Sequence, residues 1–303
     1  MFLERQPLWR WIAVVALVVS NAVASPTAWG QSGPAATEGA APSILAAPPR
    51  SWAVDAAANE LVALHHPGSY LRYRMHVIDE KGDQTRDLIE SKDGSVARLI
   101  LRDGRPLTDA EDKAEQQRLN NMIASPSDFV RHIKNDASGR RIADQMVRLM
   151  PDAMLFSYTP GQPQTGRNGD ALEVVLDYMP NPQFKPPSTT AEALTGLEGR
   201  MWIDAKSHYL VRMEGTVFRG INFGWGMLAH IYPGGKLVLE QTDAGGGRWI
   251  FTHFTEEVNV RALLVKTMNV REEVETSSFQ TLPGPMSYQD AIHMLLNTPL
   301  PGR

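Results

Sequence analysis

The stretch from Leu197 to Phe218 constrains the fold of this 303-residue chain more than any other part of it. A polar turn that begins at Asp204 separates two apolar segments, as expected for two antiparallel strands joined by a tight turn. In the second segment alternate residues fall on two faces: Tyr209, Val211, Met213 and Val217 on one, and Leu210, Arg212, Glu214 and Thr216 on the other. This period of two predicts a strand with one face in a core and the other toward water or a ligand.

Further segments with the same alternation predict a large sheet. We expect strands at 70–78, 85–91, 96–102, 155–158, 172–178, 223–231, 236–241, 249–256 and 259–270, the last with a possible extension to 275. Consecutive strands this close together are antiparallel, because a parallel crossover needs about a dozen residues or more.

Short segments with helical spacing interrupt the strands. A helix is expected from Ser51 to about residue 64, and another after Ser287. A block of three lies between them, at 108–123, 125–135 and 140–150, and the last is expected to stop at Pro151. Strands with helices inserted in one block predict the α+β class, as a large curved antiparallel sheet with short helices covering its concave side. No linker is apparent within 51–303, so these residues are expected to form a single domain.

The N-terminal residues resemble an export signal. Two arginines precede a short apolar run that ends in the small-residue pattern Ala22-Val23-Ala24. This predicts a cleaved signal peptide at 1–24, with cleavage as late as residue 30; an uncleaved anchor is the alternative. Residues 25–50 are rich in Pro and Ala and are expected to be a flexible tether. The cleaved signal predicts a periplasmic or otherwise exported protein with no stable membrane span once mature. Because the chain has no cysteine, it is not expected to be a lipoprotein.

Several function classes leave no trace in the sequence. The net charge is −4 with both signs interleaved, which argues against a nucleic-acid partner. Eight histidines are scattered without a ligand motif, although a site from residues such as His253 and Glu256 could assemble in space. Neighbouring carboxylates at 256–257 and 272–273 point to opposite faces of a strand, and Asp204 is best explained as a turn residue. We therefore expect no catalytic residue, no metal and no cofactor.

Large apolar side chains on the predicted strands are the remaining candidates for a site. If weak helices cover a curved sheet, its concave face can hold an elongated cavity. The candidate ligand-binding residues are Trp202, Met213, Phe223, Trp225, Met227, Trp249 and Phe251. An acyl chain of about 16 carbons would gain roughly 10–13 kcal/mol there before ordering costs, at about 0.8 kcal/mol per CH₂. The alternative for each of these residues is an ordinary place in the core.

One family matches this pattern in outline. The sequence Gly199-Arg-Met-Trp-Ile-Asp204, followed by Leu210-Val-Arg-Met-Glu214, resembles the hairpin of LolA-like, outer-membrane lipoprotein-sorting proteins. The resemblance covers roughly 52–280 and implies a half-open β-barrel whose helices form a lid over an acyl-binding cavity. By that resemblance the lid is 108–123, 125–135 and 140–150. Arg72 or Arg74 would then hold it through the carbonyls at a helix C-terminus.

Together these observations predict a periplasmic, non-enzymatic binding or carrier protein for a lipid, an acyl chain or a lipoprotein. The first alternative is a structural or protein-interaction module of the envelope, with a filled core and an envelope protein as its partner. The second is an enzyme on the same sheet. A dry, lipid-sized cavity would favour a carrier over a structural module.

Overall fold

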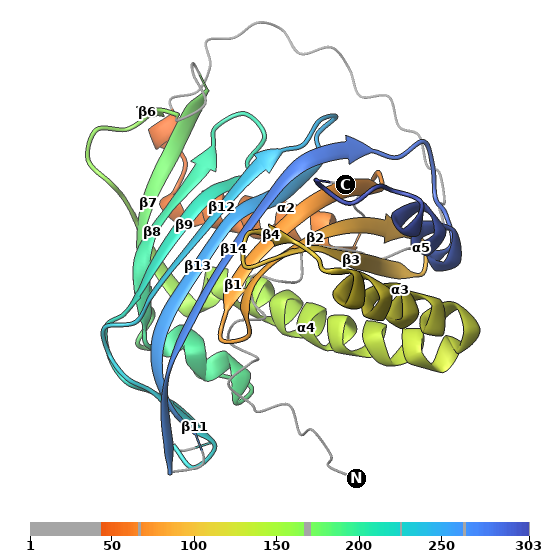
Figure 1. Ribbon diagram of the computed structural model, residues 1–303. Coiled ribbons are helices and arrows are strands. Elements are labelled where there is room, and N and C mark those ends of the chain that lie inside the picture. Colours follow the sequence, from red (N-terminus) through yellow and green to blue (C-terminus); the bar gives the residue numbers. More distant parts are fainter. Residues whose placement is uncertain (1–43, 66–67, 167–170, 225, 263–264, 303) are drawn as a thin grey trace, which may run out of the picture.

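The computed structural model describes residues 44–65, 68–166, 171–224, 226–262 and 265–302 (Figure 1). The predicted signal peptide and most of the predicted tether lie outside these residues. Residues before Ser51, where the folded part was expected to begin, already contact the sheet and α4: the Ala47 carbonyl accepts a hydrogen bond of 2.7 Å from the Tyr158 hydroxyl. Arg50 likewise donates to the Pro151 carbonyl at 3.0 Å.

A single antiparallel sheet forms the body of the molecule, and its two ends do not meet. Its main path runs β4-β3-β2-β1-β14-β13-β12-β9-β8-β7-β5, with β6 on β7 and the pair β10–β11 on β13. The strands are β1 (Leu71–Asp79), β2 (Gly82–Ser91), β3 (Gly94–Arg102), β4 (Arg105–Pro106), β5 (Met154–Tyr158), β6 (Gln164–Thr165), β7 (Leu172–Pro180), β8 (Leu197–Asp204), β9 (Leu210–Val217), β10 (Ile221–Phe223), β11 (Ala229–Ile231), β12 (Lys236–Asp243), β13 (Trp249–Ala262) and β14 (Lys266–Thr281). The predicted fold class, α+β with a large curved antiparallel sheet, is confirmed.

The hairpin of β8 and β9 forms as predicted. Leu197 pairs with Val217 at its open end and Ile203 with Leu210 near the turn. Asp204 closes the turn, since its Oδ1 accepts hydrogen bonds from the Lys206 and Ser207 amides and from the Ser207 hydroxyl. Its carboxylate is therefore a turn cap.

The helices divide between the two faces of the sheet. They are η1 (Ile44–Ala46), α2 (Pro49–His65), α3 (Asp109–Ala124), α4 (Pro126–Ala153), η2 (Thr190–Thr195) and α5 (Tyr288–Leu296). We call the face that α2 covers the inner face; Trp52 and Ala56 of α2 pack there on Leu176 and Ile203. The C-terminal half of α4 joins α2, and the sheet curves around both (Figure 1). None of the described helices is long and apolar enough to cross a bilayer.

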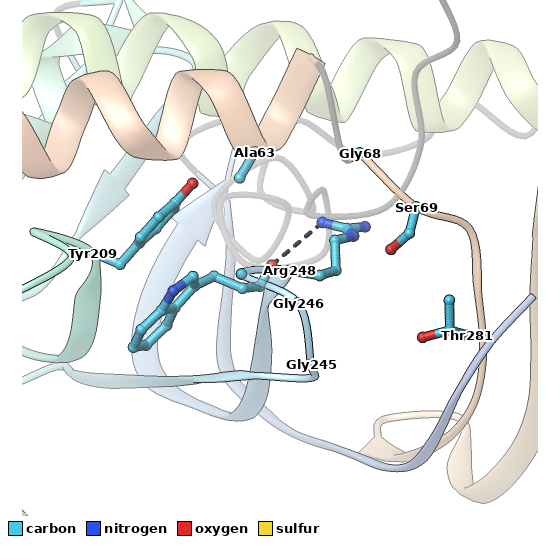
Figure 2. A pocket seen from close by; sticks show the side chains of 10 residues that line it. Ala63, Gly68, Ser69, Tyr209, Gly245, Gly246, Arg248 and Thr281 are labelled. Carbon is cyan, nitrogen blue, oxygen red and sulfur yellow. Dashed lines mark hydrogen bonds between the residues drawn. The ribbon is translucent and has the colours of Figure 1, made fainter. Parts of the chain in front are cut away.

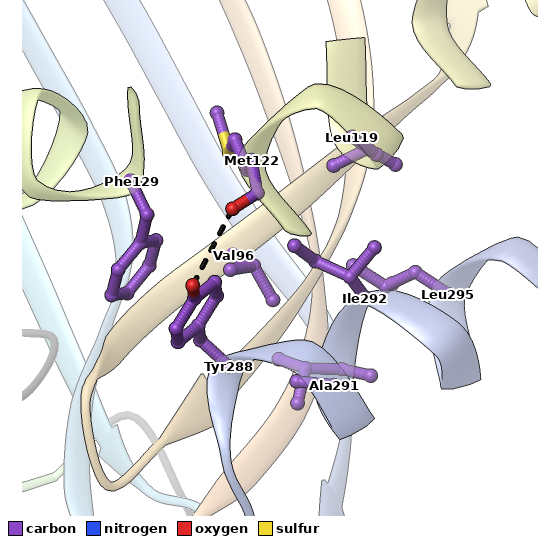
Figure 3. Close-up of a cluster of buried hydrophobic side chains, with 9 residues drawn as sticks. Val96, Leu119, Met122, Phe129, Tyr288, Ala291, Ile292 and Leu295 are labelled. Carbon is purple, nitrogen blue, oxygen red and sulfur yellow. Dashed lines mark hydrogen bonds between the residues drawn. The ribbon is translucent and has the colours of Figure 1, made fainter. Parts of the chain in front are cut away.

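The opposite, outer face is covered at β2 and β3 by α3, α5 and the start of α4. Ile89 and Val96 pack there against α3, α5 and the start of α4 (Figure 3). The Phe129 and Tyr288 rings stack at one side of this cluster, with centroids 3.7 Å apart. The Tyr288 hydroxyl donates to the Met122 carbonyl at 3.4 Å, so the ring that fills this core also ties α5 to α3.

Side chains of α3 and α4 form hydrogen bonds with backbone groups along the edge of β3. The short strand β4 pairs only with the last two residues of β3, Leu101 and Arg102. Glu115 accepts a 2.8 Å hydrogen bond from the Leu99 amide, and Arg118 donates to the Ala97 carbonyl at 2.6 Å. The ring Nε2 of His132 lies 3.0 Å from the Ser95 carbonyl. Backbone groups that would otherwise invite another strand are therefore occupied.

Three expectations about the limits of elements were wrong. The segments 125–135 and 140–150 form one continuous helix, α4, which runs past Pro151 because a proline in the last turn removes only a terminal bond. The expected strand 223–231 is a hairpin, β10–β11, since Gly224 and Gly226 have φ of 57° and 80°. The reversal expected near 257–258 lies beyond Ala262 instead.

Candidate functional site

A cavity of about 390 Å³ opens at one end of the inner face (Figure 2). It lies where the C-terminal turn of α2, the segment before β1, the start of β9, the β12–β13 loop and the end of β14 meet. Its lining is Ala63, Gly68, Ser69, Tyr209, Gly245, Gly246, Gly247, Arg248, Trp249 and Thr281. This volume falls in the range of small-molecule sites, about 300–1,000 Å³.

Three consecutive glycines shape the floor of the cavity. Gly245, Gly246 and Gly247 have φ of 114°, 67° and 79°, all in the left-handed region that side chains disfavour. Asp243 fixes the loop, because its two carboxylate oxygens accept the Gly245 and Gly247 amides at 2.8 and 3.1 Å. A Cβ at any of the three glycines would meet no atom within 4 Å, so backbone conformation is what requires glycine here.

A buried ion pair supports this floor. The Arg248 side chain is 3% exposed and its Nη2 lies 3.0 Å from Oε1 of Glu90, which is fully buried. The other Glu90 oxygen accepts the Leu71 amide at 3.0 Å, and Arg248 also donates to the Trp249 carbonyl at 3.3 Å. Burial raises the pKa of Glu90, and the Arg248 guanidinium opposes that rise. Because Glu90 is on β2 and Arg248 precedes β13, the pair spans β1 and β14 across the curve of the sheet.

An aromatic wall faces a polar side. The Tyr209 and Trp249 rings stack with centroids 5.2 Å apart and planes within 11°. Figure 2 places Tyr209 across the cavity from the hydroxyls of Ser69 and Thr281, with Arg248 between them. The cavity therefore has an apolar, planar side and a hydrogen-bonding side, which suits an amphiphilic ligand.

A second carboxyl, Glu60, lies one turn before Ala63 on α2. Its carboxylate accepts a hydrogen bond of 3.0 Å from the side-chain amide Nε2 of Gln241 on β12. Burial raises its pKa to about 7, and the hydrogen bond from Gln241 opposes this. The same carboxyl contributes to the raised pKa of Tyr209, after burial of the phenol. The Glu60 carboxyl thus titrates near neutral pH close to Tyr209 of the Tyr209–Trp249 stack.

The structure separates the seven residues predicted to line one cavity. Trp249 lines the cavity, whereas Phe251 does not: it belongs to the core cluster with Tyr73 and is 1% exposed. Met213 is half-buried on the inner face, whereas Phe223 belongs to a different cluster with β10 and β11. Met227 is 56% exposed. Trp225 lies outside the described residues.

Trp202 lies on the outer face, because its neighbours Met201 and Ile203 point inward to α2. Its ring is flanked by two guanidinium groups, with Arg212 at 5.7 Å and Arg200 at 6.0 Å from the ring centroid. These distances fit cation–π contacts. Trp202 is therefore not a wall of the inner cavity.

The arginines predicted to hold a lid bind a strand instead. Arg72 and Arg74 both contact Asp87 of β2, at 3.0 and 3.4 Å, and Arg72 also donates to the Thr298 hydroxyl. The expected bonds to a helix C-terminus are made by Arg98 of β3, whose Nη1 reaches the carbonyls of Leu295, Leu296 and Thr298. Its Nη2 bonds Asp112 of α3 at 3.0 Å. The helix held by these bonds is α5, which follows the sheet and was not among the predicted lid segments.

The residues that build the cavity were mostly missed from sequence. Tyr209 was placed on a strand face, and the glycine cluster was interpreted as a hairpin turn, which it also is. Glu90 and Arg248 lie 158 positions apart, and no local pattern joins them. The one available signal was a run of three glycines bounded by Asp243 and Arg248, longer than a tight turn needs.

Comparison with protein-family models, with curated proteins and with solved structures found no match to this chain.

Proposed function

We propose that this protein is a non-enzymatic binding protein of the cell envelope that carries a lipid-like amphiphile, such as a fatty acid or the acyl chain of a lipoprotein. The proposal rests on the half-barrel sheet with its end cavity, and on the LolA-like hairpin motif of the sequence. The single observation that carries it is the two-sided lining of that cavity, with the Tyr209–Trp249 stack opposite the hydroxyls of Ser69 and Thr281.

The chemistry of the lining favours an amphiphile over a fully polar ligand. Methylene groups gain about 0.8 kcal/mol each on burial, so several carbons against the aromatic wall suffice for useful affinity. A head group that accepts hydrogen bonds would lie toward Ser69 and Thr281. The two terminal nitrogens of Arg248 are already bonded to Glu90 and to the Trp249 carbonyl, and its buried Nε has no hydrogen-bond partner among the described residues. The guanidinium therefore contributes mainly positive potential at the cavity.

Binding is tested first on the protein as its host makes it. Native mass spectrometry of protein purified from the host envelope should show an added mass of lipid size. The purified protein should also take up a fluorescent fatty acid, with one site per chain.

Matched variants then place the ligand. Trp249→Ala should lower fatty-acid affinity at least about tenfold, because it removes half of the stacked wall. Trp202→Ala is the control, since that ring lies on the outer face and its loss should leave affinity unchanged. Equal effects of the two variants, or protein recovered without lipid and without uptake, would reject the carrier proposal.

One observation favours a second candidate, an envelope structural or interaction module with a filled core. Buried inner-face residues of β1, β2, β13 and β14 pack against one another around Tyr73 and Phe251, each 1% exposed. The cavity is confined to the end of this filled face. Failure of both binding experiments, with a folded protein, would favour this second candidate.

A further inference from the structure

A rung of side chains on the outer face brings together two imidazoles and a carboxylate. Glu275 of β14 is the register partner of His76 on β1 and of His253 on β13. Paired residues of antiparallel strands point to the same face, so all three side chains share the side away from α2. Glu273, two residues before Glu275, points the same way.

The distances leave room for an ion between these groups. One oxygen of Glu275 lies 3.8 Å from Nδ1 of His253, and the other lies 3.9 Å from Nδ1 of His76. Both separations are too long for hydrogen bonds. Ligand atoms of His253, Glu273 and Glu275 all lie within 4.8 Å of one another. Donors around a tetrahedral Zn²⁺ lie about 3.4 Å apart, given bonds of about 2.0–2.2 Å, so small side-chain rotations close the set.

Asp83 prepares one imidazole for this role. Its Oδ1 lies 2.8 Å from Nε2 of His76. A hydrogen on Nε2 satisfies that contact and leaves Nδ1 unprotonated, facing Glu275. A carboxylate that orients a histidine from behind is the usual partner of a metal-ligating imidazole. This contact is independent of the acidic residues in the cluster and points to a ligand on the Nδ1 side.

We propose that His253, Glu273 and Glu275 bind a divalent transition-metal ion of the Zn²⁺ class. His76 does not belong to that set of mutually close ligand atoms, and it becomes the fourth ligand when its side chain rotates toward the ion. Mixed nitrogen and oxygen donors suit Zn²⁺ better than Mg²⁺ or Ca²⁺, which prefer oxygen alone. The strands β1, β14 and β13 are neighbours, so the sheet holds the donors in place before the ion arrives. The His76 and His253 side chains are 33% and 29% exposed, which leaves the ion access from solvent.

The surrounding charges favour a cation. Glu240 is the register partner of His253 on the side away from Glu275, and its charge is met by Arg212. Arg74, the nearest arginine on β1, is committed to Asp87. The negative charges of Glu273, Glu275 and Asp83 therefore lie beside the imidazoles of His76 and His253, and neither Arg74 nor Arg212 neutralises them.

Titration of the purified full-length chain with Zn²⁺ by calorimetry tests this site. We expect one ion per chain, and loss of that binding in His253→Gln and in Glu275→Gln. Asp83→Asn should weaken it by about tenfold through His76, the effect typical of an outer-shell partner. Glu257→Gln is the control, because Glu257 is exposed on the same face of β13 but pairs with Arg271 and Lys236.

Co²⁺ gives an independent readout. The wild-type chain should develop the visible absorption of a tetrahedral Co²⁺ complex, and the His253→Gln chain should not. Absence of stoichiometric binding, or binding that survives both His253→Gln and Glu275→Gln, would overturn the site. Circular dichroism of each variant, unchanged from wild type, separates loss of a ligand from loss of the fold. The site is on the face opposite the end cavity, so this result is independent of lipid binding.

Discussion

At the scale of single residues, Glu256 is a carboxyl buried in the sheet beside a second carboxyl. It is 3% exposed on the inner face and is the register partner of Glu272. Burial, and then the charge of Glu272, raise its pKa to about 8, so it holds a proton at neutral pH. The unfolded chain releases that proton near pH 4.5, its ordinary value.

This predicts a pH-dependent stability with a definite sign. The folded state binds more protons than the unfolded state between pH 4.5 and about 8, so the free energy of unfolding falls as pH rises through that window. Glu60, with a pKa of about 7, acts in the same direction at lower pH. Between pH 7 and 8 the slope is mainly that of Glu256, with a limit of about 1.4 kcal/mol per pH unit.

Urea unfolding at several pH values measures this slope. Glu256→Gln keeps a neutral side chain of the same shape, so most of the fall in stability between pH 7 and 8 should disappear, and the remainder is the smaller contribution of Glu60. Glu257→Gln, the exposed neighbour on the outer face, should retain the wild-type slope. A Glu256→Gln protein with the wild-type slope would show that this carboxyl is already ionised.

The pairs Glu256–Glu272 and His253–Glu275 could not be found from the sequence, because each depends on the register of β13 and β14. Strand neighbours such as Glu256 and Glu257 were correctly placed on opposite faces. The turn between β13 and β14, however, was expected near 257–258, and it lies after Ala262. That shift hides both the contact of Glu256 with Glu272 and the rung of His253 with Glu275. His253 and Glu256, suggested as joint ligands, point to opposite faces.

At the scale of elements, Arg98 joins β3 to two helices. Its guanidinium is 5% exposed and bonds three carbonyls at the end of α5 as well as Asp112 of α3. Cations are favourable at a helix C-terminus, and low solvent exposure strengthens these charge-assisted bonds. We therefore expect α5 to depend on this one side chain.

Arg98→Met tests that dependence. It keeps the length of the side chain but leaves the buried Asp112 without its cation, which should cost roughly 3–5 kcal/mol of stability. Hydrogen exchange should rise most in α5. Arg105→Met is the control, since Arg105 pairs with Glu111 in solvent and its loss should have little effect. Unchanged exchange in α5 would contradict the assignment.

Local sequence signals predicted some elements better than others. Thr108 and Glu111 form the expected capping box at the start of α3, and Ser287 caps α5. Short-range hydrogen bonds of this kind depend on residues three apart, so sequence reveals them. The single length of α4 and the split of 223–231 depend on packing and on glycine conformation, which the alternation of side chains does not record.

At the scale of the whole molecule, the pair Glu90–Arg248 connects distant parts of the curved sheet. Two strands separate its members along the sheet, yet their side chains meet at 3.0 Å. The contact therefore exists only while the sheet is curved. A buried charge that loses its partner is strongly destabilising, by about 3–5 kcal/mol.

A double-mutant cycle tests this link. Arg248→Met and Glu90→Met should each lower the free energy of unfolding by that amount, because each leaves one charge buried alone. The double variant should be more stable than the Arg248→Met chain, since no unpaired charge remains. Effects that simply add would show that the two residues act independently, against the proposed link.

The end of the sheet at β3 has one further property. Along β3 the outward amide and carbonyls of residues 95, 97 and 99 are already bonded by Glu115, Arg118 and His132. A second chain that approaches this border finds side chains where it would need backbone partners. In terms of assembly, α3 and α4 cap this edge of the sheet, and a chain without them would expose an edge strand that can pair with other chains and polymerise.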